Sequence, residues 1–133
     1  MQKIDCLKKI KPSFFPAIIW FIITTILLTL PGSSFPKNDW LDKIWADKWV
    51  HIGLFAIMVF LWCWSMLRIY PASKRLKIIF IRVSIAGLIY GIGMEFVQKY
   101  FIPLRSFEVG DIMADAAGCI VGVVYSISRY IKK

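Results

Sequence analysis

A small group of polar residues in a strongly apolar chain carries side chains suited to acid–base chemistry or ligand binding. His51 and Glu95 could exchange a proton with a substrate, and Asp47, one helical turn before His51, could orient its ring. Lys48 and Arg105 could bind a phosphate or a carboxylate group. Gln98 and Asp111 could orient a substrate or a water molecule, and Asp115 is a further candidate for substrate binding. None of these is a Ser or Cys nucleophile with its own base, so covalent chemistry would need His or a carboxylate.

Composition identifies the surroundings of these residues. The chain has 133 residues, of which 59% are hydrophobic and 19% are charged. Because soluble domains contain about 45–50% apolar residues, this composition excludes both a water-soluble globule and a disordered chain. The formal net charge of +9 leaves no solvated basic face for nucleic acid, so we interpret the chain as a basic integral membrane protein with lipids as partners. The three cysteines are too far apart to form a metal or redox motif.

Hydropathy predicts four membrane-spanning helices in a single domain that covers residues 1–133. A helix needs about 20 residues to cross a hydrocarbon layer of about 30 Å. The predicted spans are residues 14–30, 49–67, 78–102 and 112–128. We therefore expect an all-α four-helix bundle. Residues 1–34 could instead be a cleavable signal peptide, but their apolar run is longer than the usual ~7–15 residues, so we expect a retained helix.

The connections between these spans predict the orientation. Residues 1–13, residues 68–77 and the tail carry an excess of Lys and Arg, whereas residues 31–48 and 99–111 hold acidic and basic residues in equal number. Because Lys and Arg accumulate in cytoplasmic segments, we expect both termini on the cytoplasmic side. Residues 36–48 are predicted to form an amphipathic helix at the opposite surface, with its apolar side chains against the bilayer. Those side chains are Trp40, Leu41, Ile44 and Trp45.

The polar residues of different spans are predicted to reach one depth. His51 begins the second span, Glu95 lies about 25 Å beyond the start of the third, and Asp115 lies about one turn into the fourth. Ionisable groups in a membrane cost several kcal/mol, so their agreement in depth predicts a shared polar pocket on the non-cytoplasmic side. Small residues share a helix face with the acidic ones and predict close packing of the third and fourth spans. They are Gly87, Gly91, Gly118 and Gly122.

The same residues resemble the signatures of the VanZ-like family. Residues 47–51 (DKWVH) resemble its DK-x-x-H, residues 95–98 (EFVQ) its E-x-x-Q, and residues 105–111 its R-x-x-x-x-x-D. Residues 115–118 and Gly122 resemble its closing N-x-x-G and glycine, with Asp115 where Asn is expected. The resemblance covers roughly residues 14–128. It implies a small protein of the bacterial cytoplasmic membrane, in a family named for a protein associated with teicoplanin resistance, and it supplies no reaction.

Several functions remain open at this point. The pocket could belong to an enzyme that acts on a lipid or lipid-linked envelope precursor, or to a non-catalytic protein that binds such a ligand or the glycopeptide itself. The polar residues could also only hold helices together. A divalent-metal site formed by His51, Glu95, Asp111 and Asp115 is a further alternative, although no established motif assigns a metal ligand. The residues name no cofactor and no oligomeric state.

Overall fold

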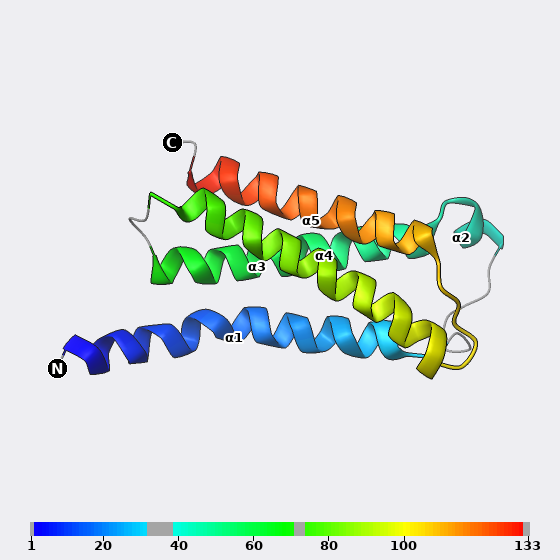
Figure 1. The fold of residues 1–133 in the computed structure, drawn as a ribbon, viewed down its shortest axis with the longest axis horizontal. Coiled ribbons are helices and arrows are strands. Elements are labelled where there is room, and N and C mark those ends of the chain that lie inside the picture. The colour runs from blue at the N-terminus through cyan, green and yellow to red at the C-terminus, as the bar shows by residue number, and fades with distance from the viewer. Residues whose placement is uncertain (1, 32–38, 71–73, 132–133) are drawn as a thin grey trace.

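The computed structural model describes residues 2–31, 39–70 and 74–131. All regular structure in these ranges is helical, which confirms the predicted all-α class. The helices are α1 (Gln2–Thr29), α2 (Asp39–Lys43), α3 (Ala46–Ile69), α4 (Leu76–Phe101) and α5 (Val109–Tyr130), as Figure 1 shows.

Three of these helices, α3, α4 and α5, are long and apolar enough to cross a membrane. In α1 the apolar stretch Phe14–Thr29 is shorter than the roughly 17–25 residues of a typical span, so α1 meets this criterion less well than the sequence predicted. Many large apolar side chains face outward, including Ile89 at 65% exposed and Ile120 at 59%. An apolar exterior of this kind fits hydrocarbon rather than water, and the structure supports a membrane protein.

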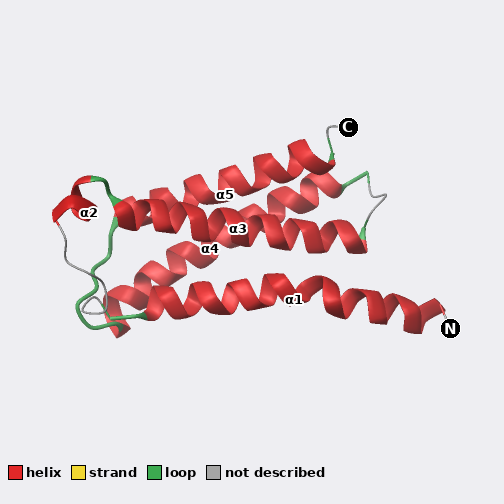
Figure 2. Cartoon of the chain, turned by 180° about the vertical axis from the view of Figure 1, so that it is seen from behind, coloured by secondary structure: helices red, strands yellow, loops and turns green. Residues whose placement is uncertain are grey.

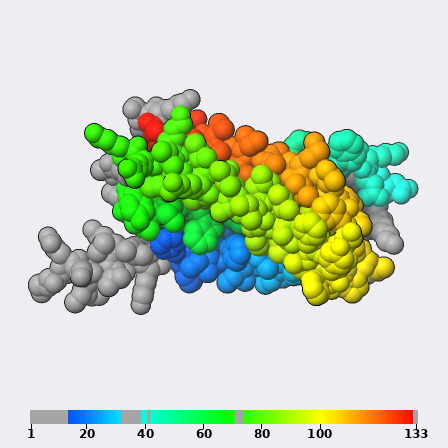
Figure 3. Space-filling model, in the orientation of Figure 1, coloured from blue at the N-terminus to red at the C-terminus, as the bar shows by residue number. Residues whose placement is uncertain are grey.

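The four long helices run in alternating directions (Figures 1 and 2). The first turn of α1, the end of α3, the start of α4 and the last turn of α5 lie at one end of the bundle, and α2 lies at the other. Helix α3 contacts each of the other long helices. Helix α1 packs against α3 and α4 and makes no contact with α5 in the described residues. In the space-filling view of Figure 3, α4 covers the near face and α1 forms its lower edge.

The closest helix contact joins α5 to α3. A Cβ atom on Gly118 would lie 2.5 Å from the Ile52 carbonyl oxygen, and one on Gly122 would lie 2.7 Å from the carbonyl oxygen of Ala56. The sequence predicted that these two glycines would face the third predicted span, which is α4. The structure corrects this prediction, because Gly118 and Gly122 face the backbone of α3, the second predicted span. Only a residue without a side chain allows two backbones this close.

The glycines of α4 lie against both neighbouring helices. A Cβ atom on Gly87 would lie 3.3 Å from Cys119 on α5 and 3.3 Å from Val59 on α3. A Cβ atom on Gly91 would lie 2.7 Å from the Asp115 Oδ2 atom. The α4 glycines therefore allow α4 to lie close to Asp115, as the predicted packing of this face requires.

The predicted surface helix is shorter than expected. Helix α2 covers only Asp39–Lys43, and Trp45 separates it from α3 with a left-handed φ of 54°. Trp40, Ile44 and Trp45 are exposed, as an interfacial segment requires. Residues 36–38 and the Leu41 side chain lie outside the described part of the chain.

The glycine contact with α3 can be tested by adding one methyl group. Gly118→Ala is expected to destabilise the protein by about 1–3 kcal/mol, because the new Cβ collides with the α3 backbone. Gly93→Ala is the matched control, since a Cβ atom there meets nothing within 4 Å. Gly93→Ala should raise stability by roughly 0.5–1 kcal/mol through helix propensity. Unfolding of both variants in detergent, followed by circular dichroism, is the measurement; similar midpoints for the two would contradict the close approach.

Candidate functional site

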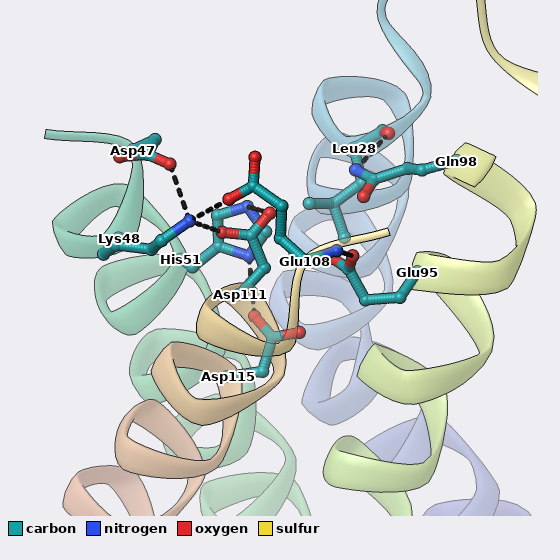
Figure 4. A network of polar contacts seen from close by, with 9 residues as sticks. All are labelled: Leu28, Asp47, Lys48, His51, Glu95, Gln98, Glu108, Asp111 and Asp115. Atoms are coloured by element: carbon teal, nitrogen blue, oxygen red, sulfur yellow. Dashed lines mark hydrogen bonds and ion pairs between the residues drawn. The ribbon is translucent and has the colours of Figure 1, made fainter. Parts of the chain in front are cut away.

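A cluster of charged side chains lies at the end of the bundle where α3 and α5 begin and where α1 and α4 end (Figures 1 and 4). His51 lies about 8 Å from the start of α3, Asp115 about 9 Å from the start of α5, and Glu95 about 9 Å from the end of α4. The three residues therefore share one depth. Because helix N-termini carry partial positive charge, the starts of α3 and α5 favour the carboxylates of Asp47 and Asp111 in their first turns.

Lys48 is the centre of the outer part of this cluster. Its Nζ atom donates hydrogen bonds to Asp47 Oδ2 at 2.9 Å, to Glu108 Oε2 at 2.5 Å, and to Asp111 Oδ1. The ammonium group thus links α3 to the start of α5 (Figure 4). From the sequence, Lys48 was predicted to bind a phosphate or carboxylate group of a substrate. Carboxylates of the chain itself already use its donors, so Lys48 is a bridge between helices in this arrangement.

His51 and Asp115 form the buried part. The Nδ1 atom of His51 lies 2.7 Å from Asp115 Oδ1, and the two residues are only 5% and 1% exposed. The carboxylate fixes the orientation of the ring, as in proteins that use His as an acid or base. Asp47 was predicted to orient this ring, and the structure corrects that prediction. The Asp47 side chain is 61% exposed, and its Oδ2 atom accepts the hydrogen bond from Lys48 instead.

Glu95 joins the cluster from α4. It is 1% exposed, and its Oε2 atom accepts a hydrogen bond of 3.1 Å from the backbone N–H of Glu108. Ligand atoms of His51, Glu95 and Asp111 all lie within 4.8 Å of one another. Side chains from three helices thus meet at one place, as the common depth predicted.

Gln98 lies one turn beyond Glu95 and has a different partner. Its Nε2 atom donates to the backbone carbonyl of Leu28 at 2.8 Å. Because α1 ends at Thr29, this carbonyl belongs to the last turn, where intrahelical donors run out. Gln98 therefore ties α4 to α1, and its buried Oε1 atom has no hydrogen-bond partner in the described residues. This oxygen is available for the predicted role of orienting a substrate or a water molecule.

Arg105 lies, half-buried, in the loop that leads from α4 to α5, three residues before Glu108. Leu104 beside it has a left-handed φ of 59°, which turns the chain at this point. The loop places Arg105 at the same end of the bundle as the cluster.

Sequence reasoning missed two participants. Glu108 binds Lys48 through its side chain and Glu95 through its backbone N–H. The sequence feature that could have identified Glu108 is its position directly before a helix, three residues ahead of Asp111. Leu28 takes part through its backbone carbonyl, which no side-chain pattern could reveal.

The electrostatics of the cluster favour a cation. Acidic side chains outnumber the ammonium of Lys48 and the imidazole of His51 in the network of Figure 4. These acidic residues are Asp47, Glu95, Glu108, Asp111 and Asp115. The innermost side chains, those of His51, Glu95 and Asp115, are only 1% to 5% exposed. Lys48 and Glu108, in the outer part of the cluster, are more exposed, at 22% and 50% of their side chains.

A partly open apolar cavity of about 270 Å³ lies between α1, α3 and α4, farther along the helices from the cluster. The residues that line it include Phe21, Met58, Trp62, Val83, Gly87 and Tyr90. Gly91, which abuts Asp115, lies one turn after Gly87 of the cavity lining, on the same face of α4. One face of α4 therefore leads from the apolar cavity to the charged cluster.

The pairing of Asp115 with His51 predicts a graded response to substitution. Asp115→Ala leaves a buried imidazole without its partner and should cost about 1–3 kcal/mol of stability. Asp115→Asn should cost less, because the amide oxygen still accepts a hydrogen bond from Nδ1. Thermal unfolding in one detergent would compare both variants with the parent. Equal losses in the two variants would contradict the hydrogen bond as the source of the stability.

Comparisons with known proteins give little further information. The chain matches no protein-family model, and no solved structure is detectably similar to it. It is 27% identical over 110 residues to an uncharacterized protein, C11E3.10, of Schizosaccharomyces pombe. The match covers 83% of this chain and 59% of that protein, so the chain spans about three fifths of this relative's length.

Proposed function

We propose that this chain is a VanZ-like membrane protein whose charged cluster binds or processes the headgroup of a lipid or lipid-linked envelope precursor. The motif residues that carry the resemblance support this proposal, because they meet in one network although they come from different helices. Those residues are Lys48, His51, Glu95, Asp111 and Asp115. Motif residues that are far apart in the sequence but meet in one network favour a shared role over separate structural roles.

The observation that carries the proposal is the buried His51–Asp115 pair beside Glu95. An imidazole held by a carboxylate at 2.7 Å, with a second carboxylate within 4.8 Å of it, is a suitable arrangement for proton transfer. Burying these groups in a membrane protein costs free energy, and this cost favours a functional role for them. The cluster lies at one end of the membrane-spanning helices, at the level expected for the lipid headgroups.

The apolar cavity supports a lipid as the ligand. It is lined by apolar side chains and lies on the same face of α4 as Gly91 and Glu95. A lipid whose headgroup reached the cluster could therefore place a hydrocarbon chain along this face. Pockets that combine a large apolar part with a few polar groups are typical of ligand sites.

In this proposal both termini are cytoplasmic and the cluster faces the opposite side of a bacterial cytoplasmic membrane. The distribution of Lys and Arg supports this orientation, together with the bundle, in which the start of α1 and the end of α5 lie away from the cluster. By resemblance alone, the envelope ligand is one connected with glycopeptide resistance.

A purely structural function is the second candidate, and specific contacts favour it. Lys48 binds three carboxylates, and Gln98 binds the Leu28 carbonyl, so both link helices that would otherwise separate. Hydrogen bonds between membrane helices contribute only about 0.6 kcal/mol on average, however, which is little return for burying Glu95, His51 and Asp115 together.

Glu95→Gln tests the chemical role with little change in size. Cells that produce the parent protein or Asp42→Asn should differ from cells without the protein in the abundance of one lipid or lipid-linked class. Cells with Glu95→Gln should not, because an amide cannot take a proton. Asp42 is exposed in α2 and serves as the control. Mass spectrometry of lipid extracts is the measurement, and a parental profile with Glu95→Gln would contradict the proposal.

Two further variants separate catalysis from binding in the same assay. His51→Ala should remove the effect on lipids if the site transfers protons. If His51→Ala keeps the parental profile and Arg105→Ala loses it, the protein is a non-catalytic binder. Structural contacts alone would instead leave every stably folded variant with the profile of the parent.

The orientation can be measured by introducing one exposed cysteine at a time in a Cys6→Ser background. Ser106 and Lys74 are both exposed, and they lie at opposite ends of the bundle. Ser106→Cys should react with a membrane-impermeant maleimide in intact cells, and Lys74→Cys should react only after permeabilisation. Cys63 and Cys119 are buried and should contribute little background. The opposite labelling pattern would refute cytoplasmic termini.

A further inference from the structure

The inner side of the cluster brings together three different ligand atoms. A His51 ring nitrogen and one carboxylate oxygen each from Glu95 and Asp111 lie within 4.8 Å of one another. Each comes from a different helix, α3, α4 or α5, and all three residues are buried. Figure 4 shows these side chains pointing toward a common space.

The hydrogen bond from His51 to Asp115 determines which ring nitrogen faces this space. Asp115 lies at Nδ1, so the carboxylate favours the tautomer with its proton on that atom. The Nε2 atom then presents a lone pair. It lies 3.9 Å from Asp111 Oδ2, too far for a hydrogen bond, and it makes none among the described residues.

One of these spacings, the 3.9 Å between His51 Nε2 and Asp111 Oδ2, is that of two ligands of one metal ion. Zinc lies about 2.0–2.2 Å from His nitrogen and carboxylate oxygen, so two ligands of one ion are roughly 3–4 Å apart. A metal-bound His commonly donates its other ring N–H to a carboxylate, as His51 can to Asp115.

The outer side of the cluster already contains a cation. Asp47, Glu108 and Asp111 also bring ligand atoms within 4.8 Å of one another, but the ammonium of Lys48 binds all three. Asp111 belongs to both sides, since Oδ1 binds Lys48 and Oδ2 faces His51. The inner carboxylate of Glu95 does not bind Lys48; its Oε2 atom accepts the Glu108 N–H, and a carboxylate has a second oxygen.

We propose that His51 Nε2, Glu95 and Asp111 bind a divalent transition-metal ion, Zn²⁺ or Mn²⁺, and that Asp115 holds the His51 ring from its other side. An imidazole ligand favours these ions over Ca²⁺, which prefers oxygen ligands alone. Three protein ligands leave a coordination position for water or a substrate oxygen. The proposal concerns ion binding by the chain itself and stands apart from the lipid ligand proposed above.

The test uses the full chain, purified in detergent and treated with a chelator. Titration with Zn²⁺ or Mn²⁺, followed by calorimetry and elemental analysis, should give one ion per chain and a higher unfolding temperature. Glu95→Gln and His51→Ala should abolish saturable binding. Asp115→Asn should weaken it by about 10–100-fold, as loss of a partner behind a metal-bound His does. Asp42→Asn should bind as the parent does, because it removes an exposed acidic residue outside the cluster.

Other outcomes would overturn the proposal. One is that neither ion binds the parent chain at a ratio near one. Another is that Glu108→Gln abolishes binding while Glu95→Gln keeps it, which would move the ion to the outer carboxylates. Size-exclusion profiles identify variants that fail to fold. If His51→Ala fails, the pair Glu95→Gln and Glu108→Gln still decides between the two positions, and the parent titration does not depend on any variant.

Discussion

Carboxylates inside a membrane protein need partners, and this constraint explains the arrangement at the end of this bundle. Each buried acid has a partner on another element: Asp111 has Lys48, Asp115 has His51, and Glu95 has the backbone N–H of Glu108. The starts of α3 and α5 add the positive ends of two helix dipoles. The cost of removing these groups from water is thus offset by contacts that also hold α3, α4 and α5 together.

Close helix packing makes those contacts possible. Gly118 and Gly122 allow α5 to lie directly against the α3 backbone, which brings Asp115 within hydrogen-bond distance of His51. Gly91 allows α4 to lie against the Asp115 side chain, one turn before Glu95. The geometry of the charged groups therefore depends on residues that have no side chain, and larger residues at these positions would separate the charges as well as the helices.

The excess of acidic over basic side chains in the cluster decides whether it favours an anionic or a cationic ligand. Lys48 is surrounded by carboxylates, so the basic residue best placed to bind an anion is already paired inside the protein. An excess of acidic groups around His51 favours a cation, and a bound metal ion would in turn allow an anionic headgroup to approach. Ion binding and lipid binding can accordingly belong to one site, although each is tested by a separate measurement.

The amino-acid sequence alone determined the helical class, the approximate limits of three of the four predicted spans and the common depth of His51, Glu95 and Asp115. It could do so because hydropathy depends on residue type and the rise per residue of a helix is constant. Only the tertiary structure decided the pairings. It placed Asp115 rather than Asp47 beside His51, gave Lys48 to carboxylates, gave Gln98 to the Leu28 carbonyl, and turned the α5 glycines toward α3. Pairings depend on how each helix is rotated and which helix lies next to it, and those are settled by packing among residues far apart in the chain.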